Sequence, residues 1–240
     1  MACQVHRFNC GLPCTTTTLS PLPSGSNTFF FEKSLDWRGA LIEAHPENGL
    51  RKVQEFRKNT AIFTTAICEK GENKSVHFTQ RGGPVGASIG DASDTHLKVW
   101  HPNGTDNSLV IACLPMQYII DATGLYDLDL FSLDVEGAEL TVLQTIDFNL
   151  TNIRVIVVEL DGTNTKKDMN VRSLLFNRGF VEFSYPGRSN ETNAKAIRDQ
   201  CRFRRRGACP ENEVFVNPFF EERRRSQKNL LQYGTGKRCE

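Results

Sequence analysis

Residues 128–143 contain the side chains of this chain that are best placed to do chemistry. A short apolar run, typical of a buried strand, ends abruptly in an acidic turn that contains Asp134 and Glu136. Gly137 follows, and apolar residues then recur at helical spacing, beginning with Leu140. Two carboxylates on a turn between a strand and a helix could act as a base, bind a metal ion or bind a sugar hydroxyl. We therefore place the candidate catalytic chemistry at these two acids.

The same acidic turn also has a purely structural interpretation. Carboxylates near the start of a helix complement its dipole and accept hydrogen bonds from its unpaired N–H groups. Glu139, in the first turn of the expected helix, fits this role. From these residues alone, a functional site and a capped helix start stay open as alternatives.

Two other expected strands also end in acids. The apolar segment 40–42 is followed by Glu43, and the strand expected over 154–159 ends in Glu159. Strands alternate with helical segments, which predicts an α/β fold with a mostly parallel, doubly wound sheet. Right-handed crossovers bring the carboxyl ends of such strands to one edge, where we expect these acids to meet Asp134. Glu43 follows the strand expected at the second position of such a sheet. A carboxylate at that place can accept hydrogen bonds from the ribose hydroxyls of a nucleotide-like cofactor.

The elements that position these acids follow from hydrophobic periodicity and from turn residues. We expect helices over 27–35, 46–58, 115–123 and 170–177, and strands over 40–42, 60–67, 75–79, 97–100, 108–114, 128–133, 154–159, 180–185 and 213–216. The segments 97–100 and 108–114 are expected to form a hairpin. The glycine-rich stretch 81–94 has the composition of a loop, and no Lys-Ser/Thr follows it in the register of a phosphate-binding P-loop.

Length and charge narrow the class of protein. With 240 residues, the chain is long enough for one α/β domain with a full core. Its 29 basic and 28 acidic residues nearly cancel, so no overall field favours nucleic acid or a membrane surface. No apolar stretch approaches the length that spans a bilayer. We expect a soluble chain with neither a nucleic-acid partner nor a transmembrane segment.

The eight cysteines show no Cys-x-x-Cys spacing, which argues against a zinc site, and we predict no metal ligands. Cys68 and Cys113 lie in apolar, strand-like segments and are interpreted as small buried residues. Cys201 and Cys209 flank a short basic loop and could pair in an oxidising compartment.

The sequence does not fix the compartment. Residues 1–31 hold no Asp or Glu, as in an organelle transit peptide, but we favour a divergent or artefactual first exon. Sequons at Asn73, Asn103, Asn149 and Asn190 fit a secretory route, although a chain rich in Asn, Ser and Thr produces several by chance. We favour the cytoplasm, with the secretory pathway and an organelle as alternatives.

Five short segments occur in an order and spacing that match a known family. They are SNTFFFEK at 26–33, WRGALIEAHP at 37–46, CLP at 113–115, SLDVEGAEL at 132–140 and VIVVE at 155–159. Together they resemble the FkbM-type methyltransferase domain, especially the eukaryotic branch that includes the Star-like proteins. The resemblance covers about residues 26–182 and is most specific around 128–146.

This resemblance implies a class I, S-adenosylmethionine-dependent methyltransferase with a Rossmann-like sheet, typically acting on hydroxyl oxygens. It implies that Glu43 holds the cofactor ribose and that Asn27 lies on the cofactor side. Asp134 and Glu136 would lie beside the sulfonium and the acceptor, where a carboxylate accepts or orients the hydroxyl proton. We rank a metal held by these acids below direct base action, because no further ligand pattern is visible. The acceptor is expected to be a hydroxyl of a small molecule, glycan or lipid.

One feature of the family has no counterpart in this chain. Members carry a first strand and a glycine-rich turn, acidic-x-Gly-Ala-x-Asp-Gly, just before the segment that matches 26–33. Here the segment 19–25 contains Pro21 and Pro23, and proline lacks the N–H that a central strand needs. Only Gly25 remains of the glycine-rich turn. We therefore expect a sheet that lacks its first central strand and has a gap there.

The expected domain organisation has three parts. They are an atypical, disordered N-terminus over 1–25, a methyltransferase-like domain over 26–218 and a charged, frayed tail over 219–240. An O-methyltransferase, represented here by a chain with a faulty or truncated N-terminus, is one interpretation. A catalytically inactive module for binding or trafficking, as the Star-like relatives suggest, is another. A dinucleotide-dependent oxidoreductase is the interpretation with the weakest support, because the GxGxxG fingerprint of dinucleotide-binding domains is missing.

Overall fold

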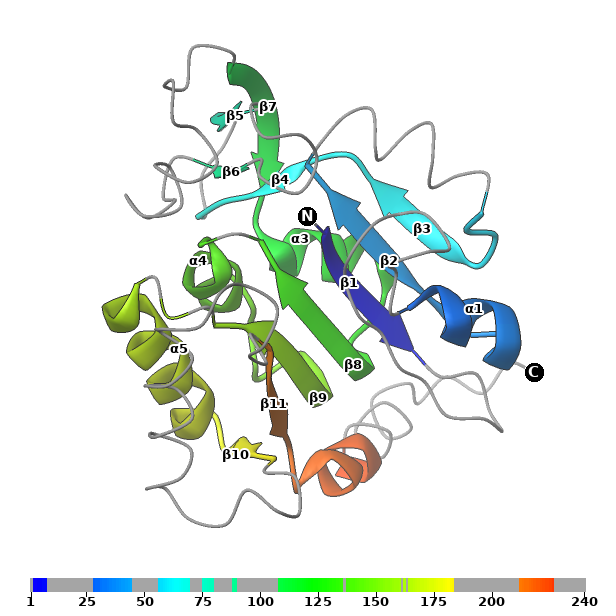
Figure 1. Ribbon diagram of the computed structural model, residues 1–240. Coiled ribbons are helices and arrows are strands. Elements are labelled where there is room, and N and C mark those ends of the chain that lie inside the picture. Colours follow the sequence, from blue (N-terminus) through cyan, green and yellow to red (C-terminus); the bar gives the residue numbers. More distant parts are fainter. Residues whose placement is uncertain are drawn as a thin grey trace, which may run out of the picture.

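A seven-stranded sheet forms the centre of the protein in the computed structural model (Figure 1). The structure describes residues 2–7, 28–44, 56–69, 75–79, 88–89, 108–135, 137–160, 162, 164–183 and 212–226. In spatial order, the sheet consists of β10 (Val181–Glu182), β11 (Asn212–Val216), β9 (Asn152–Glu159), β8 (Asp127–Asp134), β1 (Ala2–Arg7), β2 (Arg38–Glu43) and β3 (Thr60–Phe63).

Most strands of this sheet run in the same direction. β2 and β3 are parallel, as are β8 and β9, whereas β1 and β11 run opposite to the others. The order β3-β2-β1-β8-β9 is the 3-2-1-4-5 order of a doubly wound sheet, apart from the direction of β1. The predicted α/β fold with a mostly parallel, Rossmann-like sheet is therefore confirmed.

The slot of the missing first strand is occupied by the N-terminal segment. β1 lies between β2 and β8 and is antiparallel to both, so that Ala2 pairs with Glu43 on one side and with Asp134 on the other. Two flanking strands offer backbone N–H and C=O groups to an extended segment of either direction. In the described part of the sheet, the strand between β2 and β8 is thus antiparallel to both neighbours. The expected gap was wrong, and so was the expected disorder where residues 2–7 are concerned.

A smaller sheet extends beyond the central one. Its order is β4 (Ala66–Ile67), β7 (Ser108–Leu114), β5 (Ser75–Thr79) and β6 (Ser88–Ile89). β7 pairs with β5 in antiparallel fashion and with β4 in parallel. The partner expected for β7, the segment 97–100, lies outside the described residues, as does the segment 46–55 of the helix expected over 46–58.

A disulfide closes this smaller sheet at its base. Cys68 follows β4 and Cys113 lies in β7, and their Cα atoms are 5.6 Å apart. Both residues are buried, as expected, but they are bonded to each other and not merely packed. The sequence separation of 45 residues concealed this pairing, because eight cysteines without a motif allow many connectivities. The pairing considered for Cys201 and Cys209 lies outside the described residues.

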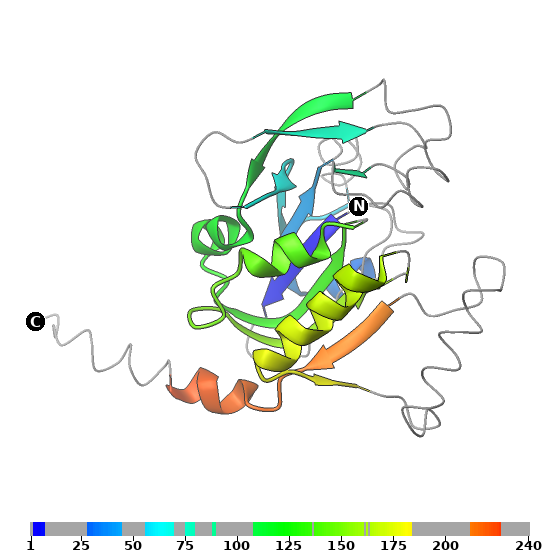
Figure 2. The same cartoon turned by 90° about the vertical axis from the view of Figure 1, so that its left-hand side faces the viewer.

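Helices pack against the central sheet and connect its strands. The labelled helices are α1 (Phe29–Leu35), α3 (Met116–Thr123), α4 (Glu139–Gln144) and α5 (Thr165–Asn177). α4 and α5 lie side by side on one face of the sheet (Figure 2). α3 ends at Gly124, whose φ of 66° is in the left-handed region that glycine adopts without strain. Among the described residues, no helix is both long and apolar enough to cross a membrane.

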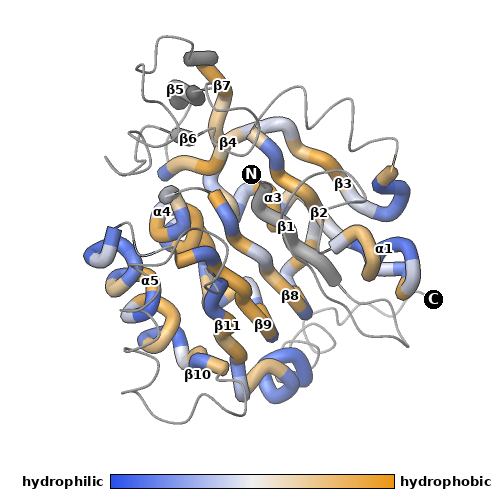
Figure 3. Tube along the Cα trace, in the orientation of Figure 1, coloured by the Kyte–Doolittle hydropathy of each residue, from blue (hydrophilic) through white to orange (hydrophobic). Residues whose placement is uncertain are grey.

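The main core fills the space between the sheet and these helices. β8 is buried from Leu128 to its end, and the tube in Figure 3 shows apolar positions in β8 and β9, which in β8 alternate with hydrophilic ones. Phe131 in β8, Leu143 in α4 and Val171 in α5 are all fully buried in one cluster. This continuous apolar layer fixes where β8 ends, and so where its terminal Asp134 lies.

The start of the expected frayed tail is ordered and docked. Residues 220–226 are helical, and the side chain of Phe220 is buried. The guanidinium of Arg154 in β9 stacks on the Phe220 ring at 4.4 Å and forms an ion pair with Glu221. The expectation of a frayed tail was therefore wrong for residues 219–226, and 227–240 lie outside the described residues.

Candidate functional site

Acidic residues line up across the edge where the parallel strands end. Glu43 and Asp134 are the last residues of β2 and β8, and both pair with Ala2 in β1. Since neighbouring strands lie about 4.8 Å apart, the Cα atoms of the two acids are separated by about 10 Å. Glu159, the last residue of β9, lies one position beyond the pair of Leu133 with Val158, in line with Asp134. The register thus brings the three predicted acids to one edge.

The burial of two of these acids distinguishes them from ordinary surface carboxylates. Only 2% of Glu43 and 6% of Asp134 is exposed. A carboxylate removed from water costs several kcal/mol unless polar partners replace its hydration. Buried carboxylates gathered at the ends of parallel strands, where ligands of such sheets bind, mark this edge as a candidate functional site.

The other two predicted site residues, Asn27 and Glu136, lie outside the described residues. Thr28, which follows Asn27, is buried, and its hydroxyl accepts a hydrogen bond from Arg57. Gly137, which follows Glu136, has a φ of 110°, so the acidic turn contains a conformation that favours glycine. The predicted roles of Asn27 and Glu136 therefore stay predictions.

The contacts of Thr28 belong to a buried polar network under α1. Glu32 accepts hydrogen bonds from Arg57 (3.2 Å), from the Thr60 hydroxyl (2.7 Å) and from the Asn59 backbone N–H (2.9 Å). Burial lowers the pKa of the Arg57 guanidinium, and the nearby Glu32 carboxylate partly opposes that shift. Because Thr60 is the first residue of β3, this network lies where β3 begins, whereas Glu43 and Asp134 lie where their strands end.

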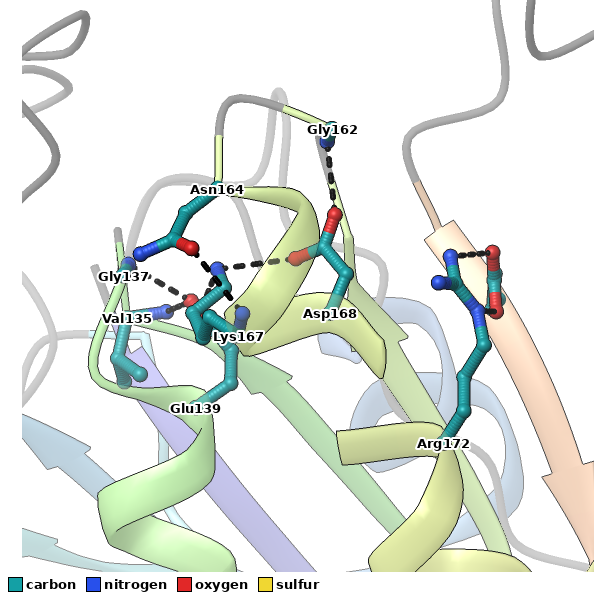
Figure 4. A network of polar contacts seen from close by, with 9 residues as sticks. Val135, Gly137, Glu139, Gly162, Asn164, Lys167, Asp168 and Arg172 are labelled. Carbon is teal, nitrogen blue, oxygen red and sulfur yellow. Dashed lines mark hydrogen bonds and ion pairs between the residues drawn. The ribbon is translucent and has the colours of Figure 1, made fainter. Parts of the chain in front are cut away.

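Glu139 fixes the acidic turn that follows β8. One of its carboxylate oxygens, Oε1, accepts hydrogen bonds from the backbone N–H groups of Val135 (3.3 Å) and Gly137 (3.0 Å) (Figure 4). The side chain is 1% exposed, so these bonds are shielded from water. Glu139 lies in the first turn of α4, as expected, but its hydrogen bonds go to N–H groups of the turn ahead of the helix and not to those of the helix start. The backbone on both sides of residue 136 is held by this one carboxylate.

A lysine and an aspartate in α5 extend this network to the turn after β9. Lys167 Nζ lies 2.6 Å from Glu139 Oε2 and 3.5 Å from Asp168 Oδ1 (Figure 4). The other oxygen of Asp168 accepts a hydrogen bond from the Gly162 backbone N–H at 3.1 Å. Asn164 caps α5 by accepting a hydrogen bond from the backbone N–H of Lys167. The two turns that follow β8 and β9 are thereby tied together through charged side chains.

Sequence reasoning missed the contribution of α5 to this site. The signal available was Asn164 three residues before Lys167, which is the spacing of an N-cap and its bonded N–H. That spacing locates the start of a helix, but it does not show that Lys167 reaches Glu139, 28 residues earlier in the chain. Among the described residues, no three His, Cys, Asp or Glu side chains are grouped to hold a metal ion.

The arrangement supports acid–base and polar recognition chemistry. Glu43 can accept two hydrogen bonds, as a vicinal diol would donate them, and Asp134 can accept a proton or orient a hydroxyl. Two negative charges on one edge also favour a cationic ligand.

The comparisons with known proteins agree with this geometry. The family model described as the methyltransferase FkbM domain matches residues 20–182, which is more than half of the chain. This match includes β2, β8 and β9 with their terminal acids, and it begins after β1. No curated protein and no solved structure matches the chain. On the strength of the family match and of a sheet with the corresponding strand order, the chain belongs to the FkbM methyltransferase domain family.

Proposed function

We propose that this chain transfers a methyl group from S-adenosylmethionine to a hydroxyl oxygen of a small molecule, glycan or lipid. The observation that carries the proposal is the buried pair Glu43 and Asp134, held in one row of the sheet at the edge where the parallel strands end. Ligands of doubly wound sheets bind at this edge. Family membership supports the reaction class.

The chemical character of the two acids suits this cofactor. Glu43, at the end of the second strand of the sheet, would accept hydrogen bonds from the ribose hydroxyls. Asp134 would lie on the side of the positively charged sulfonium, where a buried carboxylate gives favourable electrostatics. When bound, the cofactor supplies an electrophilic methyl group.

The residues of the chain would then position the acceptor and take up its proton. Asp134, joined by Glu136 on the adjacent turn, would orient the acceptor hydroxyl and accept the proton as the oxygen becomes nucleophilic. Glu139 and Lys167 would keep this turn in place, because a displaced base loses alignment with the hydroxyl. Positioning and proton removal account for the protein's share of such a displacement.

Calorimetric titration with S-adenosylhomocysteine tests the proposal directly. We expect the purified chain to bind it with micromolar affinity and Glu43→Gln to weaken binding at least tenfold, because an amide replaces one carboxylate acceptor. Asp134→Asn should bind S-adenosylhomocysteine with an affinity closer to that of the wild-type chain, but it should lose methyl transfer in a screen of hydroxyl acceptors. Thermal unfolding by circular dichroism must show that each variant is folded. A cooperatively folded wild-type chain that does not bind would contradict the proposal.

The direction of β1 favours a second candidate, a methyltransferase fold that acts only as a binding or trafficking module. In the doubly wound pattern, the first strand leads into a glycine-rich turn at the ligand-binding edge. Here β1 begins at that edge, beside Glu43 and Asp134, and ends at the opposite one. Absence of S-adenosylhomocysteine binding by a folded chain is the result expected from this candidate.

A further inference from the structure

The disulfide between Cys68 and Cys113 restricts the compartments in which this fold forms. The cysteines are 8% and 4% exposed, and the bridge joins segments 45 residues apart. Such structural disulfides persist in the secretory lumen and outside the cell, whereas the cytosol keeps thiols reduced. Proteins that fold in the secretory lumen also meet the machinery for N-glycosylation, which recognises Asn-x-Ser/Thr.

One sequon lies in the described part of the chain and is exposed. Asn149-Leu150-Thr151 forms the turn between α4 and β9, with Asn149 exposed and Leu150 54% exposed. The other sequons, at Asn73, Asn103 and Asn190, fall outside the described residues.

The turn at Asn149 is held by other side chains. The Asp147 carboxylate accepts the Asn149 backbone N–H at 2.9 Å, and the Asp147 carbonyl accepts the N–H of Thr151 at 2.8 Å. Gln117 Oε1 accepts hydrogen bonds from the Asp147 backbone N–H and from the Thr151 hydroxyl. A group added to the exposed Asn149 amide would therefore leave these bonds in place.

The location of the turn also keeps such a group away from the acidic edge. β9 begins at Asn152, three residues after Asn149. Since β8 and β9 are parallel, the start of β9 lies at the edge opposite to the one where Asp134 ends β8. A bulky substituent at Asn149 would therefore lie at the starting ends of the parallel strands, whereas the candidate site lies at their carboxyl ends.

We propose that Asn149 carries an N-linked glycan. Its Nδ2 forms a bond to the anomeric carbon of an oligosaccharide carried on a lipid pyrophosphate. The bond between that carbon and the pyrophosphate oxygen breaks, the lipid pyrophosphate leaves and Nδ2 loses one proton. In the folded chain the Thr151 hydroxyl is buried against Gln117, so attachment precedes the folding of this turn. The proposal stands independently of methyltransferase activity.

Mass spectrometry of the endogenous protein, enriched with an antibody to the chain, tests the modification. Peptide N-glycosidase in heavy-oxygen water converts a glycosylated Asn into isotopically labelled Asp. Cleavage by a Glu-specific protease and trypsin then releases residues 140–154, which separates Asn149 from the sequon at Asn103. We expect labelled Asp at position 149 and no alkylation of Cys68 or Cys113 before reduction. Unmodified Asn149 throughout the population, or reduced thiols at both cysteines, would overturn the proposal.

A matched pair of variants provides an independent measurement. Asn149→Gln removes the acceptor, whereas Thr151→Ser keeps the sequon and a hydroxyl for Gln117. Both are expressed as full chains behind a cleavable secretory signal in eukaryotic cells. We expect Thr151→Ser to match wild type on a gel, and Asn149→Gln to migrate faster by one glycan. Equal migration of wild type and Asn149→Gln, with the Cys68–Cys113 bridge formed in both, would refute the assignment.

Discussion

At the scale of single residues, the ammonium group of Lys167 balances two buried acids. It contacts Glu139 and Asp168, whose side chains are 1% and 3% exposed, and its own side chain is 10% exposed. Removal of the ammonium would leave the buried Glu139 carboxylate without this counter-charge, and the loss of one partner of a buried ion pair is strongly destabilising. The position of the acidic turn after β8 therefore depends on a residue in α5.

We expect Lys167→Met to lower the free energy of unfolding by about 3 kcal/mol, as the loss of one partner of a buried ion pair does. Lys166→Met is the matched control, since Lys166 is exposed on the same helix, and it should change stability by less than about 0.5 kcal/mol. Urea unfolding followed by circular dichroism measures both. Glu139→Gln added to Lys167→Met should restore part of the loss, and equal effects of the two lysine substitutions would contradict the ion-pair argument.

Tyr126 provides a prediction about pH. Partial loss of hydration raises the pKa of the Tyr126 hydroxyl above the ordinary value of 10.0, and the nearby Asp121, which accepts its hydrogen bond, adds to the shift. The neutral phenol is thus favoured in the folded state. Its stabilising effect is fully present below pH 10.0 and is lost as the pH rises through the higher pKa of the folded state.

Absorbance titration of the folded wild-type chain and of Tyr126→Phe isolates this phenol. The difference between the two curves should have its midpoint above pH 10.0, and Asp121→Asn should move that midpoint down. A midpoint at or below the ordinary value in the wild-type chain would show that the Asp121 contact does not form.

At the scale of elements, β1 determines whether the central sheet is continuous. It is hydrogen-bonded on both sides, so every backbone group of its interior faces a partner strand. Proline removes one ladder hydrogen bond and clashes with a neighbouring strand, except at the first position of a strand.

We therefore expect Val5→Pro to destabilise the protein by about 1–3 kcal/mol, the cost of leaving backbone hydrogen-bonding groups without a partner, whereas Ala2→Pro, at the first position of the strand, should be tolerated far better. Thermal unfolding and hydrogen exchange of β2 and β8 report the difference, because loss of β1 exposes the backbone groups of both neighbours. If Val5→Pro unfolds at the same temperature as wild type and protects the same amides, β1 does not occupy this slot in solution.

Some of these elements could be predicted from the sequence because their signal is local. The apolar runs that end at Glu43, Asp134 and Glu159 marked buried strands with polar ends, and the helical spacing from Leu140 onward marked the helix that follows β8. β1 carries no such signal: its six residues become a strand because β2 and β8 flank an open slot, which is a long-range condition.

The same reasoning explains two other differences between prediction and structure. Cys68 and Cys113 meet only because β4 and β7 pair, a contact that spacing along the chain does not encode. The helix over 220–226 is rich in charge and resembles a solvated tail, but the buried ring of Phe220 and the guanidinium of Arg154 dock it. In each case, the decisive contact joins segments far apart in the sequence.

At the scale of the whole molecule, the disulfide lies where the chain leaves the central sheet and where it returns. β4 follows β3 closely, and β7 leads directly into α3. The bridge therefore closes the base of the smaller sheet as one loop. Closing a loop of this length stabilises a fold by about 4 kcal/mol in the chain-entropy model.

The double variant Cys68→Ser/Cys113→Ser should accordingly lose about 2–4 kcal/mol of stability, and the wild-type chain in reductant should behave in the same way. Urea unfolding gives the loss, and limited proteolysis should show earlier cleavage between residues 69 and 112. If reductant does not change the stability of the wild-type chain, the bridge is not formed in the purified protein. The double variant is the control, because reductant should not change its stability in either case.

The position of Ala2 also has a practical consequence for anyone who handles this protein. Ala2 shares a row with Glu43 and Asp134, so the first residue of β1 lies between the two acids. An affinity tag or fusion partner attached at this end of the chain would lie close to the residues that the binding measurements are meant to probe. A negative titration with an N-terminally tagged chain would then reflect the tag, which makes the choice of cloning strategy part of the functional question.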